Sequence, residues 1–320
     1  MKPRVRFGNG GGAERGAFFE IARRSIPQLI RSPIMNSAHR FLAACLAVVL
    51  PLSAACAAAP PAAGQPTIFV CGDSTSKSSA PIQGWGTPVA GYFDPAKVTV
   101  SNEGHGGRSS RTYYDGDWPQ VLPKIRAGDF VLIVFGINDG TTLGGIGDET
   151  REAGGKTEHT YGWYMAKMAG DAREKGAHVF LLTVTPRDIW TNPKAKLKDA
   201  EIVSQEAGYS AAEDKIERGT GGGKYTQWTK EVGKKLGVPV LDLTNLLADK
   251  YEKMGREKVM VNYKDHNHTL PAGAEIVAAS IVSGLKAFKN SPFTPLLSDK
   301  GRAVETADAK YEVENSATTK

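Results

Sequence analysis

The chain has 320 residues, enough for one large domain or two small ones, and its 41% hydrophobic content allows a sizeable core. The formal charge of +6 arises at the start, because eight of the 40 basic but only two of the 34 acidic residues precede residue 60, which leaves 32 of each in residues 60–320. We therefore do not expect the protein to bind nucleic acid, since a phosphate-binding surface normally needs a clustered cationic excess.

The first part of the chain has the pattern of a secretory signal. Residues 35–59 combine a charged start, an apolar run over 41–52 and a small-residue end. The run is short for a transmembrane helix, so no membrane span is expected. We expect residues 1–34 to be an extended leader or the product of a misassigned start, and the mature protein to be exported, periplasmic or extracellular. A lipid anchor at Cys56 is an alternative, disfavoured because no large aliphatic residue lies three positions before it.

Five short apolar runs rich in β-branched residues predict the strands of one sheet. They are Thr67–Cys71, Val98–Ser101, Phe130–Phe135, His178–Val184 and Val238–Leu243. The third is apolar on both faces, as expected of a central parallel strand covered by helices. Helix-like stretches lie between and after the runs, over Tyr161–Lys175, Tyr225–Leu236 and Ala272–Lys289. This alternation predicts a three-layer α/β/α domain over residues 60–290, with a five-stranded parallel sheet.

Three segments do not follow the alternation. Residues 144–160 and 191–224 are polar and Gly-rich, and both follow predicted strands. Because such folds bind ligands at the carboxyl ends of their parallel strands, we expect these two insertions to shape a substrate site. The alternative is that they are surface loops without a role. Residues 291–320 have little apolar content after Leu297 and are expected to form a flexible tail.

The candidate catalytic residues come from opposite ends of the predicted domain. Ser74, in Gly72-Asp73-Ser74, follows the first strand, and Asp265 and His268 lie just before the last helix. A serine hydroxyl becomes a nucleophile when a base takes its proton, and that base needs a partner that fixes its tautomer and orientation. Ser74, His268 and Asp265 can fill these roles without a metal or cofactor. Gly-Asp-Ser by itself is also a common turn.

Two further strand ends supply candidate oxyanion-hole donors. The loop after the second strand, Ser101–Arg111, contains several glycines, at which the backbone can turn an N–H inward. Asn138 follows the third strand, from where its amide can donate to an oxyanion. The main-chain N–H of Ser74 is the third candidate. Each motif alone is compatible with an ordinary turn, so their coincidence at consecutive strand ends carries the hypothesis.

The sequence motifs of three other kinds of site are absent or incomplete. The sequence has no Gly-x-Ser-x-Gly nucleophile elbow, which argues against an α/β-hydrolase. The Gly-rich stretch 219–225 has the wrong spacing for a phosphate-binding loop, and no strand precedes it. Asp265, His266 and His268 could bind a metal, but no further ligand is evident in the sequence. No metal or cofactor is therefore expected.

These motifs together resemble the SGNH (GDSL-like) hydrolase superfamily, whose Ser, Gly, Asn and His blocks occur in order across residues 66–288. The resemblance implies a flavodoxin-like SGNH hydrolase fold, the nucleophile, acid and base named above, and an oxyanion hole formed by Ser74, Gly107 and Asn138. Five segments resemble more specifically the rhamnogalacturonan acetylesterase family of carbohydrate esterases: Gly72–Thr75, Gly107–Arg111, Gly136–Asp139, Thr185–Trp190 and Asp265–Thr269. Ile137 departs from the family pattern, because many members have His there, which leaves the substrate detail open.

The resemblance implies a secreted serine esterase that removes acetyl groups from plant cell-wall polysaccharide, with acetylated rhamnogalacturonan as the first candidate substrate. Arg108 and Arg187 could pair with uronate carboxylates, and Trp190 could pack on a sugar ring, although each also has a structural explanation. Three alternatives stay open: an acetylxylan or other carbohydrate acetylesterase, a lipolytic esterase or thioesterase of the same superfamily, and a non-catalytic carbohydrate-binding protein.

Overall fold

The computed structural model describes residues 64–198 and 200–313. The expected leader over residues 1–34, the signal over residues 35–59 and the alternative lipid-anchor site at Cys56 lie outside the described residues. Within the described part of the chain, no helix has both the length and the apolar character needed to span a lipid bilayer.

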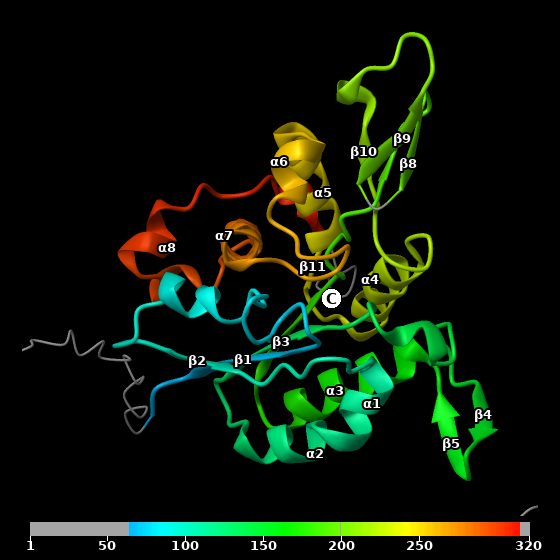
Figure 1. Cartoon of the computed structure of the whole chain (residues 1–320). Coiled ribbons are helices and arrows are strands. Elements are labelled where there is room, and N and C mark those ends of the chain that lie inside the picture. Colours follow the sequence, from blue (N-terminus) through cyan, green and yellow to red (C-terminus); the bar gives the residue numbers. More distant parts are fainter. Residues whose placement is uncertain (1–63, 199, 314–320) are drawn as a thin grey trace, which may run out of the picture. The chain divides into compact units, whose positions relative to one another are not determined.

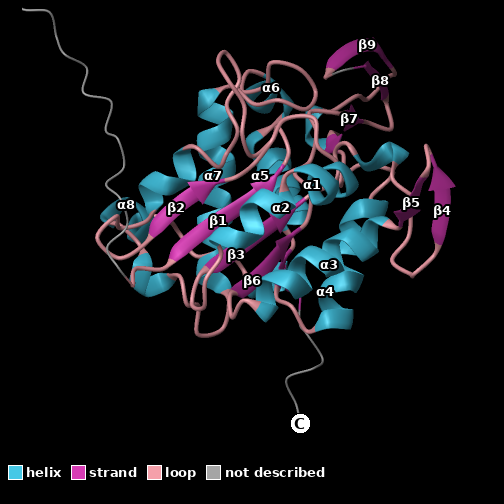
Figure 2. Cartoon of the chain, turned by 90° about the horizontal axis from the view of Figure 1, so that it is seen from below, coloured by secondary structure: helices cyan, strands magenta, loops and turns pink. Residues whose placement is uncertain are grey.

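A single mixed sheet forms the centre of the domain. In the residues that the structure describes, it has six strands in the order β12-β11-β6-β3-β1-β2. The strands are β1 (Thr67–Gly72), β2 (Thr99–Asn102), β3 (Phe130–Val134), β6 (His178–Leu182), β11 (Val240–Leu241) and β12 (Glu312–Val313). Neighbours from β2 to β11 run parallel, whereas β12 pairs antiparallel with β11. Figure 2 shows β2, β1, β3 and β6 side by side in this order.

Helices cover both faces of this sheet. The helices on one face are α1 (Ser110–Gly116), α2 (Trp118–Val121), α3 (Tyr161–Glu174) and α4 (Lys224–Leu236). The helices on the other face are α5 (Leu243–Met254), α6 (Arg256–Met260), α7 (Pro271–Ala287) and α8 (Asp299–Ala303). Successive side chains of a strand point to opposite faces, so Phe69 and Cys71 of β1 enter one core while Ile68 and Val70 enter the other. The predicted three-layer α/β/α fold is confirmed (Figure 1).

The sheet has one strand more than the five that the sequence predicts. The five predicted strands are present and mutually parallel. The sixth, β12, consists of Glu312 and Val313, which pair with Leu241 and Val240. A two-residue strand with one charged side chain carries no apolar run, so its pairing depends on the tertiary contact rather than on a local pattern.

The prediction of a flexible tail from residue 291 is wrong as far as Val313. This segment contains η5 (Thr294–Leu296), α8 and η6 (Ala309–Tyr311). The side chain of Phe293 is fully buried, and its ring centroid lies between 4.9 and 6.3 Å from three other rings, those of Phe93, Phe130 and Phe180. A few widely spaced apolar side chains, which include the buried Leu297, therefore fix a segment whose average composition is polar.

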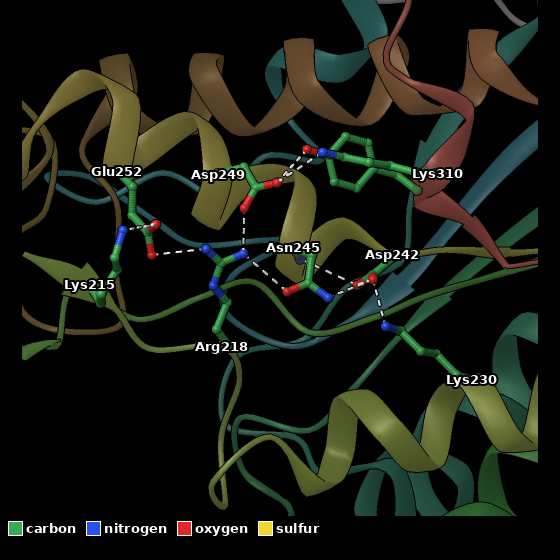
Figure 3. Close-up of polar contacts among 9 residues, drawn as sticks. Lys215, Arg218, Lys230, Asp242, Asn245, Asp249, Glu252 and Lys310 are labelled. Carbon is green, nitrogen blue, oxygen red and sulfur yellow. Dashed lines mark hydrogen bonds and ion pairs between the residues drawn. The ribbon is translucent and has the colours of Figure 1, made fainter. Parts of the chain in front are cut away.

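Ion pairs and hydrogen bonds hold the end of this segment against α5 (Figure 3). The Tyr311 hydroxyl donates to Asp249 at 2.7 Å, and the Lys310 ammonium lies 3.5 Å from the same carboxylate. Arg218 reaches Asp249 at 2.6 Å and Glu252 at 2.9 Å. These contacts join the C-terminal segment to the connection that precedes α4.

The two Gly-rich insertions each contain a β-hairpin. The first consists of β4 (Thr150–Ala153) and β5 (Lys156–His159); the second of β8 (Ala195–Lys198) and β9 (Glu201–Gln205), with β7 (Trp190–Thr191) paired to β10 (Lys215–Ile216) nearby in the chain. Short 3-10 turns complete the described elements: η1 (Pro88–Tyr92), η2 (Leu122–Lys124), η3 (Asp139–Thr141) and η4 (Ala211–Glu213). That the insertions shape a substrate site stays a prediction.

Candidate active site

The strand order places a topological switch point at β1. The chain runs from β1 to β2 on one side and then to β3 on the other side of β1, so successive connections leave in opposite directions. In open α/β sheets, ligands bind at the carboxyl ends of the strands beside such a point. Ser74 follows the end of β1, and Asn138 follows the end of β3. Both sequence-predicted residues therefore lie where the fold favours a binding site.

Ser74 lies in a tight turn directly after β1. The main-chain carbonyl of Asp73 accepts hydrogen bonds from the N–H groups of Ser76 and Lys77 at 3.0 and 3.1 Å, which closes the turn. Gly72 is required here because a Cβ at this position would collide with the Ser76 hydroxyl. The turn exposes the Ser74 side chain beyond the end of the strand without the strained elbow of an α/β-hydrolase.

The structure brings the three predicted catalytic side chains together. Nε2 of His268 lies 3.0 Å from Oγ of Ser74, although the two residues are 194 positions apart. Nδ1 of His268 lies 2.9 and 3.0 Å from the two carboxylate oxygens of Asp265. One imidazole nitrogen thus faces the hydroxyl and the other faces the carboxylate, which is the arrangement a serine–histidine–aspartate triad requires.

The Asp265 carboxylate is held by its own loop. It accepts hydrogen bonds from the N–H groups of Asn267 and His268 at 2.8 and 2.9 Å. Partial burial would raise the pKa of Asp265, but the hydrogen bond with the His268 ring and the two N–H groups outweigh it and lower the pKa below its ordinary value. Asp265 is therefore ionised over the neutral range and can orient the imidazole.

Neighbouring loops hold the Asp265–His268 loop in place. The Gln83 N–H donates to the carbonyl of Thr269 at 2.9 Å, and the Thr269 hydroxyl donates back to the carbonyl of Gln83 at 2.8 Å. On the other side, the Asp188 N–H donates to the carbonyl of His266 at 2.9 Å. These bonds link the histidine loop to the segment after Ser74 and to the loop after β6.

The two candidate oxyanion loops are joined to each other. A Cβ built at Gly106 would lie 3.8 Å from Cβ of Ser74, so this loop passes beside Ser74. Gly107 has φ +77°, which favours glycine, and nothing lies within 4 Å of a Cβ placed there. The Asn138 amide donates one hydrogen bond to the Arg108 carbonyl at 3.0 Å. No acceptor among the described residues takes its second N–H.

Asp139, which the sequence pattern assigns to an Asn-Asp-Gly turn, also links these loops through hydrogen bonds. Its carboxylate is fully buried and accepts hydrogen bonds from the N–H and the hydroxyl of Ser110 at 2.9 and 2.5 Å. Its main-chain carbonyl accepts a hydrogen bond from the Tyr225 hydroxyl at 2.7 Å. Asp139 thereby fixes the start of α1, the end of the Gly107 loop and the start of α4 relative to Asn138.

Two buried carboxyl groups, those of Asp73 and Asp139, belong to the chain neighbours of Ser74 and Asn138. Desolvation by burial raises the pKa of Asp73 to about 6, against hydrogen bonds from Thr75 that lower it. Desolvation likewise raises the pKa of Asp139 to about 6, with a smaller contribution from the negative charge of Asp73. The ordinary value for both is 3.8. Both groups therefore change charge in the weakly acidic range.

The three residues predicted to contact the substrate differ in their burial and in their partners. Trp190 is corrected to a core residue, because its side chain is only 3% exposed and its indole N–H donates to Asp188 at 2.7 Å. Arg108 lies 2.6 Å from Asp117 and remains partly exposed. Arg187 makes two hydrogen bonds of 2.7 Å to Glu217 and lines a cavity beside the oxyanion loop.

Two cavities have residues of the candidate site, or their neighbours in the chain, on their borders. One of about 460 Å³ is bordered by Gly136 and Ile137, next to Asn138 in the chain, and by residues of α4. The other, of about 270 Å³, is bordered by Asp188, Asp265 and residues around them. Within the described part of the chain, no group of three or more His, Cys, Asp or Glu side chains is arranged to bind a metal ion.

This doubly wound α/β domain, with Ser, His and Asp in contact beyond its parallel strands, has the fold of the SGNH class of ester hydrolases. The chain belongs to the GDSL-like Lipase/Acylhydrolase family, whose model matches residues 70–276. The sequence-based prediction of the superfamily, and of a carboxylic ester hydrolase, is thereby confirmed.

The chain is also similar to proteins with more specific names. The chain is 31% identical over 246 residues to the rhamnogalacturonan acetylesterase of Emericella nidulans, covering 70% of this chain and 86% of that protein. It is 29% identical over 240 residues to the rhamnogalacturonan acetylesterase RhgT of Bacillus subtilis, covering 68% and 89%. The crystal structure of the Bacillus subtilis protein YxiM shares the fold with a TM-score of 0.53 at 22% identity, over 69% of this chain and 56% of that one.

Proposed function

We propose that this protein is an exported serine esterase that removes acetyl groups from a plant cell-wall polysaccharide, with acetylated rhamnogalacturonan as its substrate. The observation that carries the catalytic part is the 3.0 Å contact between His268 Nε2 and Ser74 Oγ, with Asp265 on the other imidazole nitrogen. The similarity to two rhamnogalacturonan acetylesterases, each matched over more than four-fifths of its length, supports the substrate.

Acylation follows from the position of the imidazole. His268 takes the proton of Ser74 Oγ through Nε2 as the oxygen attacks the acetyl carbonyl, and Asp265 stabilises the imidazolium that forms. The carbonyl oxygen becomes an oxyanion, which the N–H groups of Ser74 and Gly107 and the free amide N–H of Asn138 can receive. The tetrahedral intermediate collapses when Nε2 gives the proton to the sugar oxygen, which leaves as an alcohol.

Deacylation repeats the same proton transfers with water. His268 deprotonates a water molecule, which attacks the acetyl-enzyme, and the same donors stabilise the second oxyanion. The proton returns to Ser74 Oγ and acetic acid leaves, which ionises to acetate in solution. All proton transfers in both half-reactions take place between protein side chains, substrate and water, so the reaction needs no further reactant.

The surface favours a carbohydrate over a lipid. Among the described residues, the exposed large hydrophobic side chains are Val203 and Val261, which are far apart in the sequence and form no continuous apolar run. A lipolytic enzyme needs an apolar surface or channel for the acyl chain. The cavity next to Ile137 is bordered mainly by four glycines, two threonines, two cationic side chains and two aromatic rings, with Ile137 as its single aliphatic side chain.

Acetate release from acetylated rhamnogalacturonan, acetylated xylan and an aryl acetate, compared with hydrolysis of a long-chain aryl ester, tests this proposal. We expect the highest kcat/KM on acetylated rhamnogalacturonan and little hydrolysis of the long-chain ester. A preference for the long-chain ester would support the lipolytic alternative and overturn the acetylesterase proposal. Export is tested by recovering the mature protein outside the cytoplasm with an N-terminus near residue 60; retention of the whole leader inside the cell would contradict it.

A further inference from the structure

The turn that contains Gly107 is held at its two ends rather than at its tip. The Arg108 N–H donates to the His105 carbonyl at 3.4 Å, which closes a turn with Gly106 and Gly107 in the middle. Both glycines are exposed, and a Cβ built at Gly107 would meet nothing within 4 Å. Two adjacent glycines have wide backbone freedom, so the direction of the Gly107 N–H depends on how His105 and Arg108 are fixed.

A single carboxylate contacts both ends of this turn. Oδ1 of Asp117 lies 2.6 Å from Nδ1 of His105, and Oδ2 lies 2.6 Å from Nε of Arg108. Because a carboxylate only accepts hydrogen bonds, His105 carries a proton on Nδ1 whether its ring is neutral or charged. The Asp117 side chain is 19% exposed, against 52% for His105, so the carboxylate is the more firmly held partner. We call these two contacts the Asp117 clamp.

The Asp117 side chain serves this turn instead of the helices beside it. Asp117 lies between α1 and α2, in the N-cap position of α2, where an aspartate side chain often caps the first N–H groups. Its side chain makes no such bond. The main chain makes the helix contacts, because the Asp117 N–H donates to the Tyr113 carbonyl at 2.8 Å and its carbonyl accepts from the Gln120 N–H at 2.9 Å. Removal of the carboxylate should therefore leave both helices in place.

The clamped turn is joined to the candidate site at the same two residues. The His105 N–H donates to the carbonyl of Gly72, at the end of β1, at 2.9 Å. The Arg108 carbonyl accepts the hydrogen bond from the Asn138 amide at 3.0 Å. Asp117 thus holds, by their side chains, the two residues whose main chains contact the strand before the candidate nucleophile and the second candidate oxyanion donor.

We infer that Asp117 is a positioning residue, which directs the Gly107 N–H toward the oxyanion by holding His105 and Arg108. This inference rests on the proposed function for the role of Gly107 and extends it to a residue that does not contact the substrate. It also gives Arg108 a different role from pairing with a uronate, because the guanidinium charge is already shared with Asp117.

Kinetics on an aryl acetate, which lacks a glycan, tests the clamp separately from the polysaccharide. Asp117→Ala should lower kcat about tenfold to a hundredfold with little change in KM, because a displaced donor loses most of its contribution to the transition state. Binding of a trifluoromethyl ketone, whose serine adduct carries an oxyanion, should weaken by a similar factor. Asp115→Ala, which removes an exposed carboxylate from the same helix, is the matched control. Wild-type kcat and inhibitor affinity in Asp117→Ala would overturn the inference, whatever the change in stability.

Double variants test whether His105 and Arg108 act through Asp117. His105→Ala and Arg108→Gln should each lower kcat about threefold to tenfold, and neither should lower it much further in Asp117→Ala, because residues that act through one contact are not additive. Effects that multiply would contradict the clamp. It would also be contradicted if Arg108→Gln raised KM on acetylated rhamnogalacturonan and left kcat on the aryl acetate unchanged, since Arg108 would then bind the substrate.

NMR relaxation of the Gly106 and Gly107 amides tests the clamp without any turnover. Both amides should show larger motions in Asp117→Ala than in wild type, and wild-type motions in Asp115→Ala. Unchanged motions in Asp117→Ala would overturn the clamp even if the wild type releases acetate as proposed. Larger motions in a protein whose wild type hydrolyses no ester would uphold the clamp as a constraint on the turn and overturn the proposed function instead.

Discussion

The Asp139 carboxylate accepts two hydrogen bonds from Ser110, 2.9 Å from its main-chain nitrogen and 2.5 Å from its hydroxyl oxygen. This contact joins the residue after Asn138 to the start of α1, and so couples the two loops that are proposed to bind the oxyanion. Oxyanion stabilisation depends on donors held in place before the reaction begins. Asp139 is therefore expected to affect catalysis without touching the substrate.

Asp139→Ala should lower kcat on an aryl acetate about tenfold to a hundredfold, because both bonds to Ser110 are lost and the donors are no longer held in position. KM should change little, since a small acetate makes few other contacts. A loss of unfolding free energy of about 1–3 kcal/mol is also expected from the unpaired buried donors of Ser110. The control is Asp115→Ala, on the exposed part of α1. An unchanged kcat in a folded Asp139→Ala variant would refute the positioning role.

The raised pKa of Asp139 predicts a particular pH dependence of stability. Burial raises this pKa from 3.8 to about 6, so the folded state binds the proton more tightly than the unfolded state. The corresponding stabilisation is complete below the unfolded pKa and is lost as the pH rises through about 6. Urea unfolding between about pH 4 and pH 7 should show a smaller decline for Asp139→Asn than for wild type, by about 1–3 kcal/mol. Identical slopes in the two proteins would contradict the shift.

Asp265→Asn should reduce kcat about a hundredfold to ten-thousandfold, because an amide can hold His268 in the wrong tautomer and cannot stabilise the imidazolium. Stability should hardly change, since the Asp265 side chain is 46% exposed. Steady-state kinetics on an aryl acetate together with thermal unfolding measures both quantities. Asp299→Asn, at a 99% exposed carboxylate, is the control for the change of charge. Wild-type kinetics in the Asp265 variant would mean that another group orients the histidine.

Phe293→Ala should destabilise the domain by about 3–5 kcal/mol, as for other fully buried phenylalanines. The ring packs with Phe130 and Phe180 on strands β3 and β6, so its loss leaves a cavity against the sheet. Thr294→Ala, at the exposed neighbouring position, should have little effect in the same denaturant titration. If both variants unfold like wild type, the segment after residue 291 does not contribute to the core.

Local patterns were sufficient for the central architecture. The run Phe130–Phe135 is apolar on both faces, which only a strand covered on both sides by helices can bury, and β3 has that position. Each candidate catalytic residue lies at a strand end or beside a helix start, so the parallel sheet alone brings Ser74 and Asn138 to one edge. These features depend on chain periodicity, which the sequence carries directly.

Features that depend on contacts between residues far apart in the chain could not be predicted from local sequence patterns. Asp139 resembles one residue of a common Asn-Asp-Gly turn, and only its contact with Ser110, 29 positions away, distinguishes it. Trp190 lies beside a segment expected to shape the site, but its side chain is buried and its indole N–H donates to Asp188. The packing of Phe293 likewise involves partners far away in the chain.

The most direct test of the central claim is the rate of acetate release from acetylated rhamnogalacturonan by Ser74→Ala beside wild type. The Ser74 side chain forms no contact that the fold requires, so the variant should unfold at the wild-type temperature while acetate release falls at least about a thousandfold. Near-wild-type release by the folded variant would contradict the account, because the nucleophile would then lie elsewhere.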